Sequence, residues 1–358
     1  MDKQKKHYKL VVRGGYGLGN FGDDALMIEI YNFFIKWGFS NNEIAFNCYY
    51  DDYLYNLIPN VNLIDIDDKN FSFDNYIYGG GTQFYSFNNN SFDFSKKIKI
   101  LLKYFIKTFK PRNYKVFGLG LGLGPFLDPL KEFDTRTNLI KADGLWLRDP
   151  KSLDYCKKWK IKNSNTGTDI CNIIQFDINK KKDNRIGLIL RDWKDEKSED
   201  YYKSVIELIK YFIDNKIEFD PIIFSDRKDL LWEKKLVELG IEYLKWNPLD
   251  NNPYDSFIKK LNNYSLIITS RFHGAIFSAL LDIPFITIAI EPKLKMISEL
   301  YKNGSFSWKA PYDLFQILKQ IRQIKENHYN FKKSIISIRK QNNSDAIKMF
   351  DELLKKLK

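Results

Sequence analysis

The sequence predicts an α/β fold with two Rossmann-like domains that face each other across a cleft, followed by a helical tail. Short apolar segments alternate with segments of helical periodicity along most of the chain, which is the pattern of a parallel, doubly wound sheet. The alternation is interrupted by the polar, highly charged stretch DINKKKDNR at 177–185 and then starts again. We therefore expect one domain over 1–178, a second over 184–312, and C-terminal helices over 313–358 that pack on a domain or cross between the two.

The first domain is expected to begin with a strand that ends in glycines. Its strand-like segments are 8–15, 43–50, 62–66, 75–80, 114–122 and 144–149. Helical spacing of apolar residues covers 25–37 and 95–109, and a short helix with proline in its first turn follows Asp149. Strands and helices thus alternate as a parallel sheet requires.

The second domain repeats this order. Strands are expected at 185–191, 219–225, 241–244, 266–269 and 285–290, with helices at 200–215, 229–240 and 275–281. The tail is amphipathic. We expect its last residues, KMFDELLKKLK, to pack against a domain; the alternative is that they lie on a membrane surface.

Composition narrows the class of protein. The 358 residues are 44% hydrophobic and 28% charged, and no apolar run reaches the roughly 20 residues that a membrane span needs. The basic start is followed by too few apolar residues for a signal peptide, so we expect a cytoplasmic protein. Cys48, Cys156 and Cys171 show neither disulfide nor zinc spacing. The net charge of +12 suits an anionic substrate or work at the inner face of a membrane, and nothing indicates nucleic-acid binding.

Three glycine-rich segments follow predicted strands. In GGYGLGNFGDDAL, Gly17, Gly19 and Gly22 match the dinucleotide-binding pattern, but Asp23 and Asp24 would repel a pyrophosphate, so a sugar-accepting loop is favoured. In YGGGTQF (78–84) two interpretations are equally favoured: close approach of the backbone to a ligand or to the Gly17–Gly22 loop, and a tight turn. For FGLGLGLGPF (117–126), a strand packed closely on its neighbour is the stronger interpretation.

Basic residues stand at several predicted strand ends. They are Arg148 in the first domain, and Arg191, Arg271 and Lys293 in the second. The carboxyl ends of parallel strands form the ligand-binding edge of such sheets. Because arginine matches the geometry of carboxylate and phosphate oxygens, the second-domain residues predict a pocket for a small polyanion.

His273 directly follows Arg271-Phe272 at that edge. A lone histidine is more often a core residue, but a position beside an anion pocket suits a general acid. His7 and His328 fall in polar terminal segments and receive no role. No histidine or carboxylate cluster has metal-ligand spacing, so we expect no metal.

These motifs, in this order, resemble the polysaccharide pyruvyl transferase family. The shared features are the Gly17–Asp23 opening, Gly79-Gly80-Gly81, Arg148-Asp149-Pro150, the segment 270–273 and Glu291-Pro292-Lys293. Family members often have Leu where Phe272 stands and Asp where Glu291 stands. Both differences keep the type of side chain.

The resemblance implies a glycosyltransferase-B-like fold, phosphoenolpyruvate as donor, and an acceptor sugar in which two hydroxyls become bridged as a pyruvate ketal. Phosphoenolpyruvate is a co-substrate, so no cofactor is expected. On this hypothesis Arg191, Arg271 and Lys293 bind the donor, and His273 protonates it. The acceptor would be a sugar, and a lipid-linked oligosaccharide is one candidate. It would bind the first domain through Asn20, Asp23, Gly80, Gly81, Thr82 and Arg148.

Two other functions compete with this hypothesis. A glycosyltransferase using a nucleotide sugar would have the same two-domain fold, and its donor phosphates would also attract Arg and Lys. The second is a catalytically inert sugar-binding subunit of an envelope assembly complex. The joint presence of Arg271, His273 and Lys293 argues against it.

Overall fold

The protein is described by a computed structural model covering residues 5–66, 70–87, 94–109, 111–176, 183–195 and 198–357. It divides into two compact units. Unit 1 comprises Met1–Gly17, Ala25–Ile173 and Ser344–Lys358, and unit 2 comprises Leu18–Asp24 and Ile174–Asn343. Residues 18–24, expected in the first domain, thus belong to unit 2. The expected C-terminal segment is divided, with 313–343 in unit 2 and 344–358 in unit 1. Of the expected linker 177–185, residues 177–182 lie outside the described residues.

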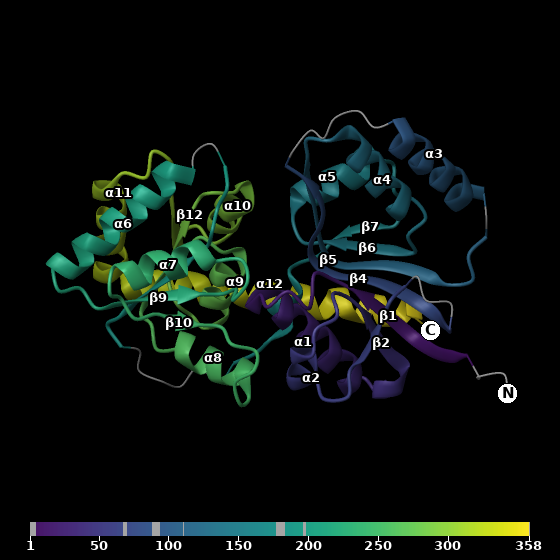
Figure 1. The fold of residues 1–358 in the computed structure, drawn as a ribbon, viewed down its shortest axis with the longest axis horizontal. Coiled ribbons are helices and arrows are strands. Elements are labelled where there is room, and N and C mark those ends of the chain that lie inside the picture. The colour runs from purple at the N-terminus through teal and green to yellow at the C-terminus, as the bar shows by residue number, and fades with distance from the viewer. Residues whose placement is uncertain are drawn as a thin grey trace. The chain divides into compact units, whose positions relative to one another are not determined.

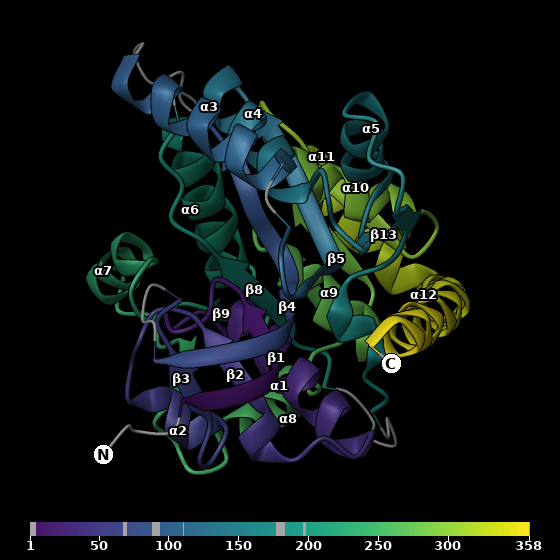
Figure 2. The same ribbon diagram turned by 90° about the vertical axis from the view of Figure 1, so that its right-hand side faces the viewer.

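Unit 1 is built on a seven-stranded parallel sheet of order β3-β2-β1-β4-β5-β6-β7. The strands are β1 Lys6–Arg13, β2 Ile44–Asn47, β3 Asn62–Ile64, β4 Phe71–Ser86, β5 Lys115–Phe126, β6 Gly144–Leu147 and β7 Ser164–Thr166. The helices are α1 Phe21–Lys36, α2 Tyr53–Leu57, α3 Phe94–Phe109, α4 Pro129–Leu139 and α5 Pro150–Lys158. Helices α1 and α2 cover one face of this sheet, and α3, α4 and α5 lie on the other (Figures 1 and 2).

The glycine-rich segments of unit 1 lie inside strands. A strand ending at Gly80 was expected, but β4 continues to Ser86, and β5 continues to Phe126. Within these strands, Gly80, Gly81, Gly120 and Gly124 have left-handed φ of +58° to +77°. Glycine adopts this conformation without steric cost, so the strands continue through these positions. A turn at Gly79–Gly81 is therefore wrong, and close packing explains Gly80: a Cβ there would lie 2.6 Å from Ile170 Cδ1.

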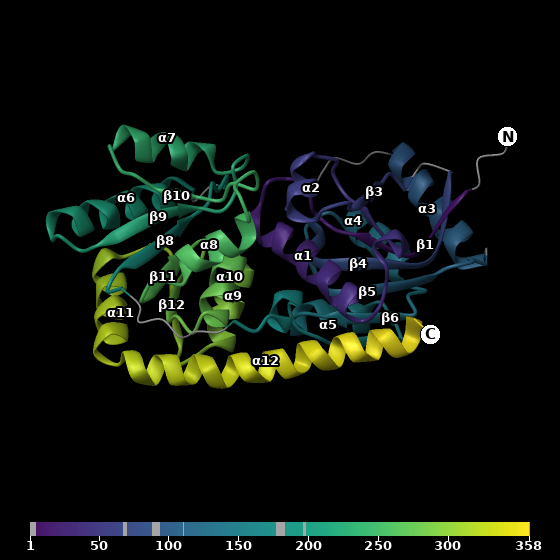
Figure 3. The same ribbon diagram turned by 90° about the horizontal axis from the view of Figure 1, so that it is seen from below.

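Unit 2 is built on a six-stranded parallel sheet of order β10-β9-β8-β11-β12-β13. The strands are β8 Ile186–Leu190, β9 Phe219–Ile223, β10 Leu244–Lys245, β11 Leu266–Thr269, β12 Phe285–Ile288 and β13 Ser305–Trp308. Its helices are α6 Ser198–Asp214, α7 Leu230–Glu238, α8 Pro253–Leu261, α9 Phe272–Leu280, α10 Pro292–Leu300 and α11 Leu314–Glu326. Helices α6 and α7 lie on one face of the sheet, and α8 and α9 on the other (Figure 3).

Helix α9 begins three residues earlier than expected. Arg271, in extended backbone, is its N-cap residue, and His273 lies in its first turn. Gly274 lies within the helix, and its lack of a side chain permits close contact with Thr269 of β11. A Cβ at Gly274 would lie 2.2 Å from Thr269 Oγ1. This close approach fixes the residues before and after it at the carboxyl end of β11.

The segment 18–24, expected in the first domain, packs in unit 2. Asn20 forms an antiparallel bridge with Ser225, and Phe21 N donates to Phe224 O at 2.9 Å. The Phe21 ring is fully buried and contacts Phe224, Trp246, Tyr254, Phe257 and Phe277 at centroid distances of 4.7–6.1 Å. Burial of this aromatic residue gives the glycine-rich segment a fixed place in unit 2.

The C-terminal helix α12 (His328–Leu357) contributes to both cores. In unit 2, Arg339 Nε donates to Asp282 at 2.8 Å. In unit 1, Phe350 is fully buried against Phe33, with ring centroids 3.9 Å apart, and Glu352 accepts a hydrogen bond from Trp146 Nε1 at 2.7 Å. Because Met349, Phe350 and Leu353 are buried in the protein, the apolar face of KMFDELLKKLK is not available to a membrane.

None of the helices in the described part of the chain is both long enough and apolar enough to span a membrane.

Candidate functional site

Charged side chains converge beyond the carboxyl ends of β8, β9, β11 and β12 in unit 2. We call them the charged cluster: Arg191, Asp192, Asp229, Arg271, Glu291 and Lys293. The three basic members were predicted from sequence, and each lies directly after a strand or in the first turn of the helix that follows it. Their carboxylate partners were not predicted to act there.

Arg271 is the most enclosed cation of the cluster, with 8% of its surface exposed. Its Nη2 forms an ion pair with both carboxylate oxygens of Asp229, which is fully buried. Its Nη1 donates to Asn20 Oδ1 at 3.2 Å, while Nε is buried without a hydrogen-bond partner among the described residues. The guanidinium is therefore oriented by two partners, and its Nε–H remains a buried donor that these partners do not use.

Arg191 and Lys293 share a carboxylate. Glu291, only 4% exposed, accepts from Arg191 Nη1 through one oxygen and from Lys293 Nζ at 2.8 Å through the other. The Arg191 guanidinium also lies 5.2 Å from the centre of the Trp193 ring. A buried carboxylate between two cations holds both in place and lowers their combined charge. The charged cluster is therefore less cationic than the predicted polyanion site.

The turn after β8 is fixed by a buried polar network. Tyr201 Oη donates to Arg191 O at 2.9 Å, and Trp232 Nε1 donates to the same oxygen at 3.1 Å. Burial raises the pKa of Tyr201, so the phenol stays neutral and acts as a donor. This network holds the backbone carbonyl of Arg191 and so fixes the position of the residue whose side chain reaches Glu291.

Asp192 connects the turn to helix α7. Its carboxylate accepts from Leu231 N at 2.8 Å and Trp232 N at 3.0 Å, while its own N donates to Asp229 Oδ1 at 3.1 Å. Burial is the main cause that raises the pKa of Asp192, and the nearby Asp229 adds to it. Asp192 thus caps α7 and orients the partner of Arg271.

The segment 18–24 completes the surroundings of Arg271. Asn20 accepts from Arg271 and donates through Nδ2 to Asp23 Oδ2 at 2.6 Å. Asp229, Arg271, Asn20 and Asp23 thus form one chain of polar contacts. Asn20 and Asp23 were expected at an acceptor site on the first domain; they instead lie beside a residue expected to bind the donor.

Gly22 is next to His273. A Cβ at Gly22 would lie 2.2 Å from His273 Nδ1, closer than any side chain tolerates. The last glycine of the predicted motif therefore leaves room for the imidazole. The motif thus lies beside the histidine.

Arg148 forms a second polar group, in unit 1. Its Nη2 donates to Thr82 Oγ1 at 2.5 Å and its Nη1 to Asp169 Oδ2 at 3.3 Å. Gly122 leaves space for the guanidinium, since a Cβ there would lie 2.7 Å from Arg148 Nε. The structure thus brings two predicted residues, Thr82 and Arg148, together in β4 and after β6. Gly80 and Gly81 precede Thr82 on the same strand.

Sequence reasoning missed Asp229 and Asp169. Both are buried carboxylates that pair with predicted arginines, Asp229 with Arg271 and Asp169 with Arg148. Asp229 follows β9 in DRKDLLW, so its place near a strand end was the available signal. Asp169 follows β7, a three-residue strand without apolar residues, and gave no comparable signal.

The fold and the charged cluster define a Rossmann-type α/β protein with two units and a site of three basic and three acidic side chains at the carboxyl edge of one sheet. The chain belongs to the polysaccharide pyruvyl transferase family, whose model matches residues 20–292. It is accordingly a transferase of polysaccharide modification. The match includes Asn20, Asp23 and every member of the charged cluster except Lys293, which lies one residue beyond it.

Solved structures confirm the predicted glycosyltransferase-B-like fold class. Anabaena HepE, solved in complex with UDP-glucose, is 11% identical, with a TM-score of 0.59 over 98% of this chain and 99% of that one. A putative UDP-N-acetylglucosamine 2-epimerase from Listeria monocytogenes is 12% identical, with a TM-score of 0.57 over 96% and 95%. S. aureus MnaA, solved with UDP, is 10% identical, with a TM-score of 0.57 over 97% and 96%. No curated protein sequence matches the chain.

Proposed function

We propose that this protein transfers the enolpyruvyl group of phosphoenolpyruvate to two hydroxyls of a sugar and forms a pyruvate ketal. The observation that carries the proposal is the arrangement around Arg271. This arginine, oriented by Asp229 and Asn20, is followed within two residues by a histidine whose ring lies against Gly22. Family membership supports the same reaction class.

The donor is a compact molecule with a carboxylate and a phosphate. Arg191, Arg271 and Lys293 are proposed to hold these groups, because arginine forks match both anions. In the absence of donor, the protein's own carboxylates hold these cations. Binding of the donor then exchanges part of the contact with Glu291 and Asp229 for contact with substrate oxygens.

The proposed reaction begins with proton transfer from His273 to the methylene carbon C3 of phosphoenolpyruvate. One sugar hydroxyl adds to the cationic C2 and loses its proton, which forms the first C–O bond. The C2–O bond to phosphate then breaks, and phosphate leaves with the electron pair. A second hydroxyl adds to C2 and closes the ketal. Of the two hydroxyl protons released, one restores His273 and the other leaves with phosphate.

The first unit is proposed to contribute to the acceptor site through Gly80, Gly81, Thr82 and Arg148. The hydrogen bond between Arg148 and Thr82 supports a shared role for these two residues. Asn20 and Asp23, which contact Arg271, are proposed to orient the first attacking hydroxyl. No resident cofactor or metal is required by this scheme, and the acceptor can be free or lipid-linked.

Phosphate release from phosphoenolpyruvate tests the proposal, measured with wild type and His273→Gln over a panel of mono- and disaccharides. We expect acceptor-dependent release that falls at least 100-fold in the variant, a typical contribution of a general acid. A variant with full turnover would exclude His273 as the acid. A thermal shift with UDP but none with phosphoenolpyruvate would instead identify a nucleotide-sugar glycosyltransferase.

A further inference from the structure

Helix α3 of unit 1 exposes its most apolar face. Five large apolar side chains have exposed fractions between 40% and 58%, and we call them the α3 stripe: Ile98, Leu101, Leu102, Phe105 and Ile106. Their spacing of three and four residues places them on one side of the helix. In a helix of a globular protein this stripe normally faces the core.

The opposite side of α3 is attached to unit 1 through α4. The rings of Tyr104 and Phe133 lie 5.5 Å apart, and Lys103 Nζ forms an ion pair with Asp134 at 2.5 Å. Figures 1 and 2 show α3 as the outermost helix on this side of the sheet, beyond α4. Among the elements that the structure describes, none of unit 1 covers the stripe.

Helix α6 of unit 2 shows the usual arrangement of the same pattern. Tyr201, Val205, Leu208, Ile209 and Phe212 have comparable spacing and are all fully buried against the sheet. The α3 stripe is therefore an apolar helix face similar to that of α6, but no described element of unit 1 packs against it. Contiguous exposed apolar surface of this kind marks a site of interaction.

The charge of α3 indicates what covers the stripe. The helix holds five lysines and no acidic residue, and the exposed Lys99 directly borders the stripe. Two copies of the chain that met through this face would bring two basic helices together, and Asp134 of α4 is already paired with Lys103. An anionic lipid surface satisfies both properties, because the stripe enters the acyl boundary while Lys99 beside it meets the headgroups.

We propose that α3 docks unit 1 on the surface of an anionic lipid bilayer. The net charge of +12 adds a long-range attraction to such a surface. The inference does not rest on the proposed reaction. If both hold, docking brings the enzyme to the surface where a lipid-linked sugar would be found.

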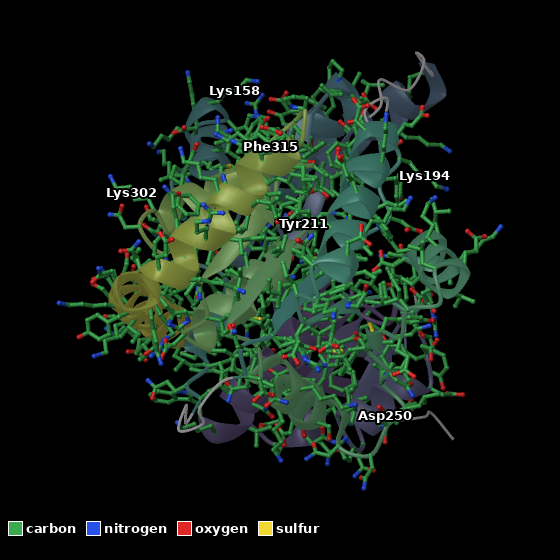
Figure 4. The ribbon with its side chains drawn as sticks, turned by 90° about the vertical axis from the view of Figure 1, so that its left-hand side faces the viewer. Lys158, Lys194, Tyr211, Asp250, Lys302 and Phe315 are labelled. Carbon is green, nitrogen blue, oxygen red and sulfur yellow. The ribbon has the colours of Figure 1, made fainter. Side chains whose placement is uncertain are left out.

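Vesicle co-sedimentation of the full chain tests the proposal. Phosphatidylcholine vesicles are compared with vesicles that contain about one third phosphatidylglycerol, at low and at high salt. The test variant is Leu102→Glu/Ile106→Glu, in which both positions are 57–58% exposed. The matched control is Val237→Glu/Phe315→Glu, which makes the same charge change at exposed apolar residues of unit 2; Phe315 is labelled in Figure 4.

We expect wild type and control to bind the anionic vesicles alike, and the α3 variant to lose at least 90% of the bound fraction. Binding should also fall at high salt. All three proteins should show the same melting temperature and the same turnover with a water-soluble acceptor. A wild type that stays in the supernatant, or an α3 variant that still sediments with vesicles, would overturn the proposal. So would a change from dimer to monomer in the variant without vesicle binding by wild type.

Discussion

Gly22 has no room for a side chain because the imidazole of His273 occupies the space beside it. The two residues are separated by about 250 positions in sequence, yet a Cβ on one would lie 2.2 Å from the ring of the other. At the scale of single residues, the site thus requires the absence of a side chain at Gly22 as well as its charged groups. The same holds for Gly122, which leaves room for the guanidinium of Arg148.

Substitution of Gly22 tests this relation. Gly22→Ala should displace the His273 ring and lower kcat at least tenfold, while the melting temperature changes by only a few degrees. Steady-state phosphate release and thermal denaturation measure the two effects. Gly38→Ala is the control, because a Cβ there meets open space and only the left-handed φ of +89° is strained. Equal kcat in the Gly22 variant and wild type would contradict the role of the glycine.

The buried pair of Arg271 and Asp229 gives a prediction for stability. Asp229→Asn would leave an uncompensated guanidinium in a nearly closed site, and we expect the free energy of unfolding to fall by about 3 kcal/mol. Urea denaturation measures this loss. Asp220→Asn provides the comparison, since the pair Arg185–Asp220 is 43% and 30% exposed and should cost less than about 1 kcal/mol. Similar losses in the two variants would contradict the argument.

The three cysteines differ in reactivity for the same reason of burial. Burial raises the pKa of the Cys156 thiol to about 12, so thiolate is scarce at pH 8, and Cys171 is fully enclosed. Only Cys48 is partly exposed. We expect Ellman's reagent to modify one thiol quickly in the folded protein and three after unfolding. In Cys48→Ser the fast phase should disappear; its persistence would place an accessible thiol elsewhere.

Residue types at strand ends could be predicted from sequence, but their partners could not. Arg191, Arg271 and Lys293 were identified because apolar strands precede them or the helices they begin. Lys293 pairs with Glu291, two residues before it, but the carboxylates that pair with Arg271 and Arg191 follow other strands, 42 and 100 residues away. No local pattern signals such a pairing, because it is determined by the order of strands in the sheet.

At the scale of elements, helical and strand periodicity identified most elements that bury an apolar face, but not helices α8 and α10, each of nine residues. The misses have physical reasons. Helix α4 (PLKEFDTRTNL) carries few apolar residues, and β13 (SFSW) is short and partly polar. The glycines of β4 suggested a turn, whereas they permit left-handed φ within a continuous strand. Helix α3 shows the limit of the method, since its periodicity predicts a buried face that is exposed.

The last turns of α12 are the element whose contribution to unit 1 is most directly testable. Phe350→Ala should remove a fully buried ring that packs on Phe33, and we expect a loss of about 3 kcal/mol in the free energy of unfolding. Ile347→Ala on the same helix is the control, because Ile347 is 42% exposed and should cost less than about 1 kcal/mol. Urea denaturation followed by fluorescence compares the two. Equal losses would mean that the ring contact does not stabilise the unit.

At the scale of the whole molecule, the net charge of +12 contrasts with the charged cluster itself. The cluster holds three cations and three carboxylates, so its own charges nearly cancel. Any attraction that concentrates an anionic donor near the protein must therefore come from the remaining surface. Such long-range attraction is screened by salt over about 10 Å at 0.1 M.

The proposed function consequently predicts a salt effect of a particular kind. Between about 20 mM and 500 mM NaCl, the KM for phosphoenolpyruvate should rise several-fold, because screening weakens the field of the whole protein. The kcat should change little, since the buried contacts of Arg271 with Asp229 and Asn20 are shielded from solvent ions. Initial rates over a donor series at each salt concentration measure both constants, with sucrose as a control for solution density. A constant KM would assign donor capture to the cluster alone, and a fall in kcat with constant KM would mean that salt acts on the proton transfer or on the acceptor.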